Sequence, residues 1–303
     1  MKNILILIYL ASTIVACSKK KVNTSTYLGL QPPAVVSQKF APGIISTENE
    51  YEFGISINRA ANKIYYAVRL NENWDAEIRC TEFIHDKWTK PGRLDLDSNF
   101  SYNDPFISLD EQKLYFMSNR PCTDTGKAKD SNLWYISKTE TGWTKPENLG
   151  PRVNSEKDEF YPSISNSGKL YFASNIHTIT EEDKWNFDIY YSAIEKGKYQ
   201  KPMRLGEEIN SKYFECDAFI APDESYIIFC SSRPGGYGEG DLYISFRDEE
   251  GNWTKAQNAG DKINTEGHEF CPFVSKDGKY FFYSSAGDIF WVSTIFIKKL
   301  REE

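Results

Sequence analysis

Apolar and polar positions alternate in short runs along this chain, and the same runs return at a regular interval. Five times, a Lys or Tyr is followed by apolar and aromatic residues, as in KLYFMSN and KYFFYSS. A second run then follows, which opens with Asp or Asn in four of the five copies, as in NLWYIS and DLYIS. Runs of this length that are rich in aromatic and β-branched side chains predict β-strands. We therefore expect an all-β fold.

A Trp-Thr-Lys-Pro motif gives the length of the repeat. It begins at Trp88 and Trp143, returns as YQKP at Tyr199 and as WTKA at Trp253, and so recurs every 54 to 56 residues. Each unit supplies four short strands, and four-stranded units of this length are typical of the blades of a β-propeller. Five units are visible, which predicts a five-bladed β-propeller over residues 31–303.

The two ends of the repeat array complement each other. The last unit has no Trp-Thr-Lys-Pro strand of its own, because the chain ends soon after DIFWVSTIFIKKLREE. Residues 33–53 align with that strand and its continuation, although no unit precedes them. We expect the N-terminal strand to complete the fifth blade, which closes the ring and removes both sheet edges.

A glycine-rich stretch, GGYGEG at residues 235–240, joins the second strand of the fourth unit to the third. A dinucleotide-binding loop needs the spacing GxGxxG and a helix after it, whose N-terminus meets the phosphate. Here the spacing differs and a strand follows. The stretch is therefore interpreted as a hairpin connection rather than a phosphate site.

The repeat resembles the WD40-like propeller repeat of the TolB type. The pieces that carry the resemblance are SSRPGGYGEGDLY, SNRP with NLWY, and FVSKDGKYFFYSS, and the repeats cover residues 31–303. The resemblance implies a propeller, a fold that carries binding, scaffold and enzyme members. TolB itself has a preceding α/β domain and six blades, so its partners are not carried over to this chain.

The N-terminus has the make-up of a secretory signal peptide over residues 1–16, with Lys2, an apolar run and then small residues. The sequence IVAC, which ends at Cys17, resembles a bacterial lipobox. This implies lipidation of Cys17, a polar tether over the rest of residues 17–30, and a membrane anchor in the bacterial cell envelope. Ser18, directly after the cysteine, fits sorting to the outer membrane. Both the periplasmic and the surface face of that membrane stay open as locations. The alternative is an ordinary signal peptide in which the cysteine falls by chance.

Composition narrows the range of partners and reactions. The chain carries 36 basic and 43 acidic residues, for a net charge of −7, and has no basic stripe, so we predict no nucleic-acid partner. Six cysteines without a CxxC pair and three histidines without HExxH predict no metal site. No cofactor is predicted, and no nucleophile elbow is present.

Carboxylates recur at the expected start of the innermost strand in four blades, and Tyr102 takes this place in the second. We predict that they form a ring at the mouth of the central channel, with His268 beside one of them. The alternative is a repeated structural role, in which each carboxylate bonds the backbone of a neighbouring blade, because buried carboxylates need partners. The four carboxylates belong to Glu52, Glu159, Glu215 and Glu269.

The loops between second and third strands are expected on the same face, and their lengths depart from the repeat. Trp74, Trp185 and Tyr237 lie in these loops, and Arg120 and Arg233 stand at equivalent positions. Exposed aromatic rings with Arg suit stacking on a sugar or gripping a peptide. The alternative is that the rings cap the blade ends. The loops are residues 71–76, 120–131, 176–187 and 233–240.

Two functions remain open at this point. The first is a lipid-anchored propeller without enzymatic activity that binds a protein or a glycan in the cell envelope. The second is a polysaccharide hydrolase or lyase that uses two carboxylates at the channel mouth as acid and base. An asymmetric carboxylate pair in a deep pocket would favour the enzyme, whereas an evenly lined funnel would favour the binder.

Overall fold

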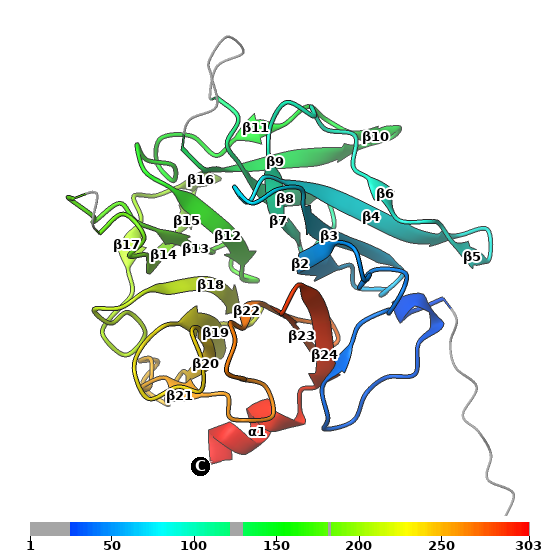
Figure 1. Cartoon of the computed structure of the whole chain (residues 1–303). Coiled ribbons are helices and arrows are strands. Elements are labelled where there is room, and N and C mark those ends of the chain that lie inside the picture. Colours follow the sequence, from blue (N-terminus) through cyan, green and yellow to red (C-terminus); the bar gives the residue numbers. More distant parts are fainter. Residues whose placement is uncertain (1–24, 122–129, 181–182, 303) are drawn as a thin grey trace, which may run out of the picture.

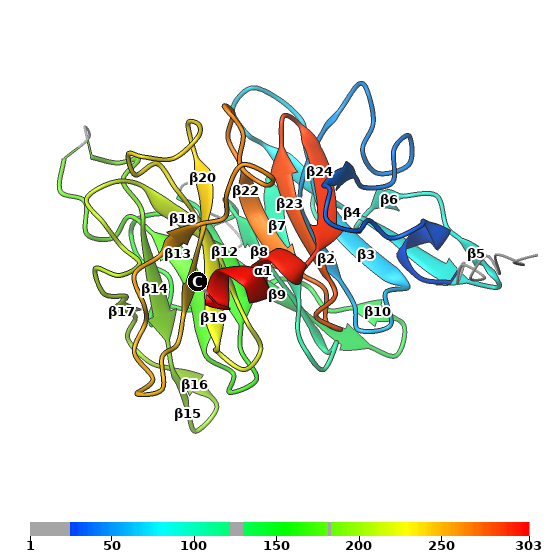
Figure 2. The same cartoon turned by 90° about the horizontal axis from the view of Figure 1, so that it is seen from below.

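Five β-sheets surround a common axis in the computed structural model, which describes residues 25–121, 130–180 and 183–302 (Figures 1 and 2). Each sheet is an antiparallel meander that runs outward from the axis, and successive sheets follow the chain order. The five-bladed propeller predicted from the repeat is therefore confirmed. The predicted signal peptide, the lipidated Cys17 and most of the tether lie outside the described residues.

Each blade has an innermost, a second, a third and an outer strand. The innermost strands are β2 (Tyr51–Ile57), β7 (Tyr102–Ile107), β12 (Glu159–Ile164), β18 (Glu215–Ile220) and β22 (Phe270–Val274). The second strands are β3 (Lys63–Arg69), β8 (Lys113–Ser118), β13 (Leu170–Ser174), β19 (Tyr226–Ser231) and β23 (Tyr280–Ser285). The third strands are β4 (Ala76–Ile84), β9 (Asn132–Thr139), β14 (Asp188–Ser192), β20 (Asp241–Phe246) and β24 (Asp288–Ser293).

The outer positions are occupied by two-residue strands, because the Trp-Thr-Lys-Pro segment pairs with the third strand only briefly. Four of these strands, β6, β11, β17 and β21, pair with the third strand of their own blade (β4, β9, β14 and β20). β5 and β10 pair further along β4 and β9, and β15 and β16 pair with each other in a separate hairpin. These strands are β5 (Lys87–Trp88), β6 (Gly92–Arg93), β10 (Gly142–Trp143), β11 (Glu147–Asn148), β15 (Ile194–Glu195), β16 (Lys198–Tyr199), β17 (Met203–Arg204) and β21 (Gln257–Asn258).

The N-terminal strand closes the ring. β1 (Gln38–Lys39) pairs antiparallel with β24, with Gln38 opposite Trp291, and takes the outer position of the fifth blade. The next residue, Phe40, is fully buried, and its ring meets those of Phe282 and Trp291 at centroid distances of 5.2 and 5.1 Å. The first and last parts of the chain thus share one sheet, as the two ends of the repeat array predicted.

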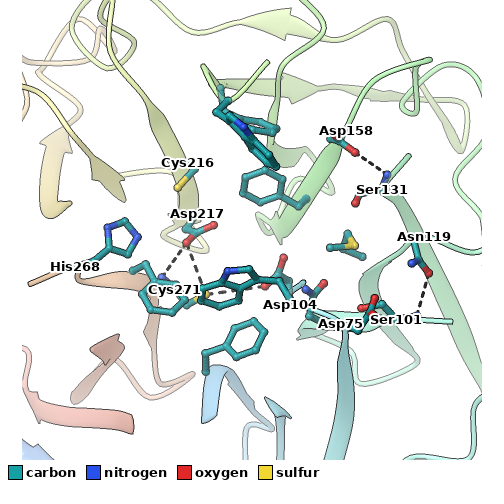
Figure 3. A pocket seen from close by; sticks show the side chains of 18 of the residues that line it. Asp75, Ser101, Asp104, Asn119, Ser131, Asp158, Cys216, Asp217, His268 and Cys271 are labelled. Carbon is teal, nitrogen blue, oxygen red and sulfur yellow. Dashed lines mark hydrogen bonds between the residues drawn. The ribbon is translucent and has the colours of Figure 1, made fainter. Parts of the chain in front are cut away.

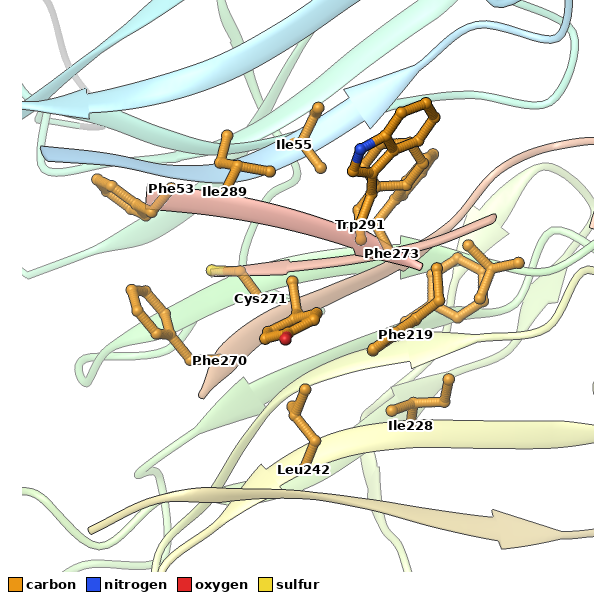
Figure 4. Close-up of a cluster of buried hydrophobic side chains, with 14 of the residues drawn as sticks. Phe53, Ile55, Phe219, Ile228, Leu242, Phe270, Cys271, Phe273, Ile289 and Trp291 are labelled. Carbon is orange, nitrogen blue, oxygen red and sulfur yellow. The ribbon is translucent and has the colours of Figure 1, made fainter. Parts of the chain in front are cut away.

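Aromatic and aliphatic side chains fill the spaces between blades. The largest cluster joins the first, third, fourth and fifth blades and is shown in part in Figure 4. A short 3-10 helix, η1 (Tyr27–Gly29), adds the ring of Tyr27 to this cluster. The C-terminal helix α1 (Ile295–Glu302) buries Ile297 there, and Arg301 donates a hydrogen bond to the Ser225 carbonyl of the fourth blade. No helix among the described residues is long and apolar enough to cross a membrane.

The glycine-rich stretch is a hairpin connection between β19 and β20, as predicted. Its glycines are required by close packing: a Cβ on Gly238 would lie 2.2 Å from the carbonyl oxygen of Gly267. A Cβ on Gly240 would lie 2.0 Å from Nδ1 of His268. Because both contacts are made with the fifth blade, the glycines let the loop of the fourth blade approach the start of the next innermost strand.

Candidate functional site

A pocket of about 670 Å³ opens at the face where the innermost strands begin (Figure 3). Two kinds of segment line it: the starts of the innermost strands and the loops between second and third strands. These segments share one face, as the sequence predicted. The lining residues include Tyr51, Phe53, Trp74, Asp75, Ser101, Asn103, Asp104, Asn119, Ser131, Asp158, Phe160, Trp185, Phe187, Phe214, Cys216, Asp217, Glu239, His268, Phe270 and Cys271.

The predicted ring of carboxylates does not line this pocket. In each blade the lining is formed instead by the residues directly before and after the predicted one. Successive side chains of a strand point to opposite sides. In the fourth blade, Phe214 and Cys216 line the pocket while Glu215 between them is fully buried. The same holds for the other blades, where the lining residues flank the predicted one. The residues placed away from the pocket are Glu52, Tyr102, Glu159, Glu215 and Glu269.

Each of these glutamates binds the Ser or Thr that precedes its strand. The Glu159 carboxylate accepts hydrogen bonds from the backbone N–H of Ser155 at 2.9 Å and from the hydroxyls of Ser155 and Ser174 at 2.5 and 2.9 Å. Burial raises the pKa of Glu159 to about 7. This geometry supports a structural role for the carboxylate, although its partners lie in the segment that leads into its own strand and in its own blade, not in the backbone of a neighbouring blade. Equivalent bonds join Glu52 to Thr47, Glu215 to Ser211 and Glu269 to Thr265.

The two predicted arginines also lie between strands rather than in the pocket. The guanidinium of Arg233 lies 4.9 Å from the ring centre of Tyr243 and donates to the Glu215 carboxylate at 3.1 Å and to the carbonyl of Ile209. Arg120 lies 4.9 Å from the ring of Trp134. Both arginines therefore stack on the third strand of their own blade.

Three of the predicted residues do reach the pocket: Trp74, Trp185 and His268. Trp185 stands at the rim with 68% of its surface exposed, and Trp74 is 44% exposed. The imidazole of His268 lies 5.2 Å from the ring centre of Phe270, and burial lowers its pKa. Tyr237 is 51% exposed but is not part of the lining.

The floor of the pocket is formed by residues that the sequence analysis missed. Every innermost strand has a bulge, and the residue at the bulge adopts a positive φ of 51 to 55°. Such a conformation is uncommon for residues other than glycine. Because the five bulges lie at equivalent positions around the axis, the side chains of three of them meet on the pocket floor. The bulge residues are Gly54, Asp104, Tyr161, Asp217 and Cys271, of which Asp104, Asp217 and Cys271 line the pocket.

Two carboxylates and a thiol meet on this floor. The sulfur of Cys271 lies 3.9 Å from Oδ1 of Asp104 and 3.7 Å from Oδ2 of Asp217. Each carboxylate also accepts one backbone N–H at 3.2 Å, from Tyr161 to Asp104 and from Cys271 to Asp217. Burial raises the pKa of both carboxyl groups, and the charge of Asp217 raises that of Asp104 further.

One signal could have revealed these residues in the sequence. The residue two positions after the predicted ring residue (Glu, or Tyr in the second blade) is where the repeats differ most in chemistry, reading G, D, Y, D and C in EFG, YND, EFY, ECD and EFC. A search for recurring residues selects the Glu two positions earlier instead. Among the described parts of the chain, no three His, Cys, Asp or Glu side chains are grouped so that they could hold a metal ion.

No protein-family model matches the chain, and no curated protein matches it. Solved structures, by comparison, do match the chain. A thermostable family-43 glycoside hydrolase superimposes with a TM-score of 0.52 at 14% identity, over 82% of this chain and 90% of that one. The Bacteroides ovatus xyloglucan PUL GH43B protein gives 0.50 at 14% identity, over 85% and 54% of the two chains. Kuenenia stuttgartiensis hydrazine synthase gives 0.52 at 13%, over 79% and 36%. These likenesses show the fold alone.

Proposed function

We propose that this propeller is a glycan-binding module whose axial pocket holds one or two sugar units. The observation that carries the proposal is the chemistry of the pocket lining. A volume of about 670 Å³ falls within the usual range for small-ligand sites. The pocket is enclosed by all five blades rather than drawn out into a groove, which suits a sugar better than an extended peptide.

Aromatic rings and short polar groups alternate around the pocket. Apolar faces of a sugar ring stack on aromatic side chains, and its hydroxyl groups need donors and acceptors close by. The ring of Trp74 packs edge to face on those of Phe53 and Phe270, at centroid distances of 5.8 and 6.2 Å. The rings of Phe53 and Phe270 are tilted relative to each other, with their centroids 6.1 Å apart. Asn103 and Asn119 add amide groups from the second blade. One of the matched structures is a thermostable family-43 glycoside hydrolase and another is the xyloglucan PUL GH43B protein, which is consistent with a sugar site on this fold.

The experiment compares two exposed aromatic residues, one inside the pocket lining and one outside it. The full chain is screened against soluble oligosaccharides, and the affinity of the ligand found is measured by calorimetry. Trp185→Ala is expected to weaken binding about tenfold, because stacking on one ring contributes about 1 kcal/mol or more. Tyr237→Ala removes a ring of similar exposure outside the pocket and serves as the control. Equal affinities of the two variants would contradict the proposed site.

We also propose that the module is anchored in the bacterial cell envelope, at the outer membrane, through a lipidated Cys17. The support is the lipobox-like IVAC sequence at the end of a short apolar run. The polar residues that precede η1 would then separate the propeller from the lipid surface, because Tyr27 already packs in the core of the propeller. Anchoring would place the pocket where polysaccharides of the envelope or the surroundings meet the cell.

A second candidate, glycan hydrolysis, is favoured by one observation. Asp104 and Asp217 are the two acidic residues among the five bulge positions, and both touch the same sulfur atom. An acid and a base on either side of a glycosidic bond are the minimum that such a reaction needs. The charge of Asp217 raises the pKa of Asp104 further, so Asp104 would protonate the leaving oxygen as the C–O bond breaks. Asp217 would accept a proton from the water that attacks the anomeric carbon.

Reducing-end release from a bound oligosaccharide tests this candidate. Asp217→Asn keeps the size of the side chain and removes its basicity, so hydrolysis is expected to fall at least about a hundredfold, as loss of a general base does. Calorimetry with the same variant shows whether the ligand still binds. Binding without any turnover in the unsubstituted protein would exclude hydrolysis and leave the binding module standing.

A further inference from the structure

The charges that line the axial pocket are almost all of one sign. Five carboxylates belong to the lining, and no Lys or Arg among the described residues does. His268 is the one basic group in the lining, and burial lowers its pKa, so its imidazole is neutral near pH 7. The pocket therefore offers its ligand acidic groups and no cation. Burial raises the pKa of Asp104 and Asp217, and an ammonium bound between them would lower it again, because an opposite charge favours the ionised form. The five carboxylates are those of Asp75, Asp104, Asp158, Asp217 and Glu239.

The two deepest carboxylates lack a cationic partner. Asp104 and Asp217 are 6% and 5% exposed. Asp104 accepts hydrogen bonds from one backbone N–H and the thiol of Cys271, and Asp217 from one backbone N–H and the thiols of Cys216 and Cys271. A buried carboxylate is costly unless it is paired with an opposite charge or fully hydrogen-bonded. Asp75 and Asp158 accept bonds from Asn71 and Ser131 and differ from the deep pair in lying nearer the surface, where water solvates their charge.

The rings at the rim already accept cations. The guanidinium of Arg69 lies 4.4 Å from the ring centre of Trp74, and the ammonium of Lys184 lies 5.6 Å from that of Trp185. Both cations approach from outside the lining. Cation–π attraction and unpaired carboxylates favour the same kind of ligand, because both stabilise a positive charge that has left water.

From these observations we infer that the sugar bound in the axial pocket carries a positively charged amino group. The inference rests on the proposed glycan-binding function and names its ligand class, which is glycans with free amino groups. The ammonium would lie between Asp104 and Asp217, and the sugar ring would stack against Trp74 or Phe270. A neutral or N-acetylated sugar would leave the two carboxylates without a partner.

A matched pair of ligands tests the inference. Calorimetry at neutral pH compares a glucosamine tetramer with its fully N-acetylated counterpart, which has the same backbone but no charge, on the full chain in detergent. The amine form is expected to bind at least about tenfold more tightly, and Asp217→Asn is expected to remove most of that preference. Glu249→Gln makes the same change in charge on the exposed hairpin after β20, at the other end of the blade, and should leave the preference unchanged.

Each other outcome has a definite reading. Equal or tighter binding of the acetylated tetramer overturns the amine inference while the glycan proposal stands. Equal loss in Asp217→Asn and Glu249→Gln also overturns it, because the preference would then reflect the net charge of the protein. Trilysine that binds the pocket as tightly as the amine tetramer shows a general cation site and refutes the assignment to amino sugars. Absence of binding by any oligosaccharide refutes the proposed function itself.

Discussion

Closure of the ring by the N-terminal segment makes a quantitative prediction about Phe40. This residue follows β1 and is fully buried, with its ring edge to face against Phe282 and Trp291 of the fifth blade. Its backbone N–H donates to the carbonyl of Ile289 at 2.7 Å. Phe40→Ala removes a whole ring from a site with no access to water, a change that costs about 3 to 5 kcal/mol.

The expected effect is a lower stability of the entire propeller. At about 2 to 4 °C per kcal/mol for a domain of this size, the Tm of Phe40→Ala should fall by about 10 °C. Thermal and urea unfolding followed by far-ultraviolet circular dichroism measure this change. Gln38→Ala is the matched control, because Gln38 lies two residues earlier in β1 with its side chain exposed, and its effect should stay within about 0.5 kcal/mol.

One result would refute the closure argument. If the segment frays independently, Phe40→Ala will release it without changing the main unfolding transition, and both variants will share the Tm of the unsubstituted protein. A fall in Tm that is confined to Phe40→Ala, with one cooperative transition, shows that the first and last strands stabilise the ring as a unit.

Three further predictions concern the glycine-rich loop, a buried carboxylate and the anchor. Gly240→Ala should destabilise the protein, because the new Cβ would lie 2.0 Å from His268. Gly92→Ala is the control and should have no such effect, because no atom lies within 4 Å of its Cβ. Equal Tm values of the two variants would contradict this reasoning. Burial raises the folded-state pKa of Glu159 to about 7, so the folded state binds the proton more tightly and stability is lost as pH rises. The unsubstituted protein should therefore lose urea stability relative to Glu159→Gln between about pH 5 and pH 8, and a constant difference would refute the cause. Cys17→Ala should leave the membrane fraction after a salt wash, and a variant that still pellets with membranes would exclude the lipid anchor.

The architecture was predictable from the sequence because it depends on local patterns that repeat. Strand-forming runs such as KLYFMSN specify their own conformation, and the interval of 54 to 56 residues specifies one blade. The missing outer strand of the last unit indicated where residues 33–53 belong, and β1 lies there. The glycine-rich loop was likewise interpreted correctly, since a strand and not a helix follows it.

The site was predictable only in part. The sequence indicated the correct face of the propeller, and with it Trp74, Trp185 and His268, because segments that join equivalent strands end on the same side of every blade. It misplaced Glu215 and its counterparts, because recurrence alone does not tell which side of a strand faces the axis. A shift of one residue along a strand moves a side chain to the opposite face.

The number of blades, their order and the closure of the ring follow from strand propensity and spacing along the chain, so they could be predicted from the sequence. The residues that meet at the axis depend on how the folded ring brings distant strands together. A bulge in each innermost strand turns one residue inward with a positive φ, and five bulges from distant parts of the chain then meet. Asp104 and Asp217 are separated by 113 positions in the numbering, yet both touch the thiol of Cys271. Their burial, their raised pKa values and their shared pocket arise from this convergence, which no local pattern encodes.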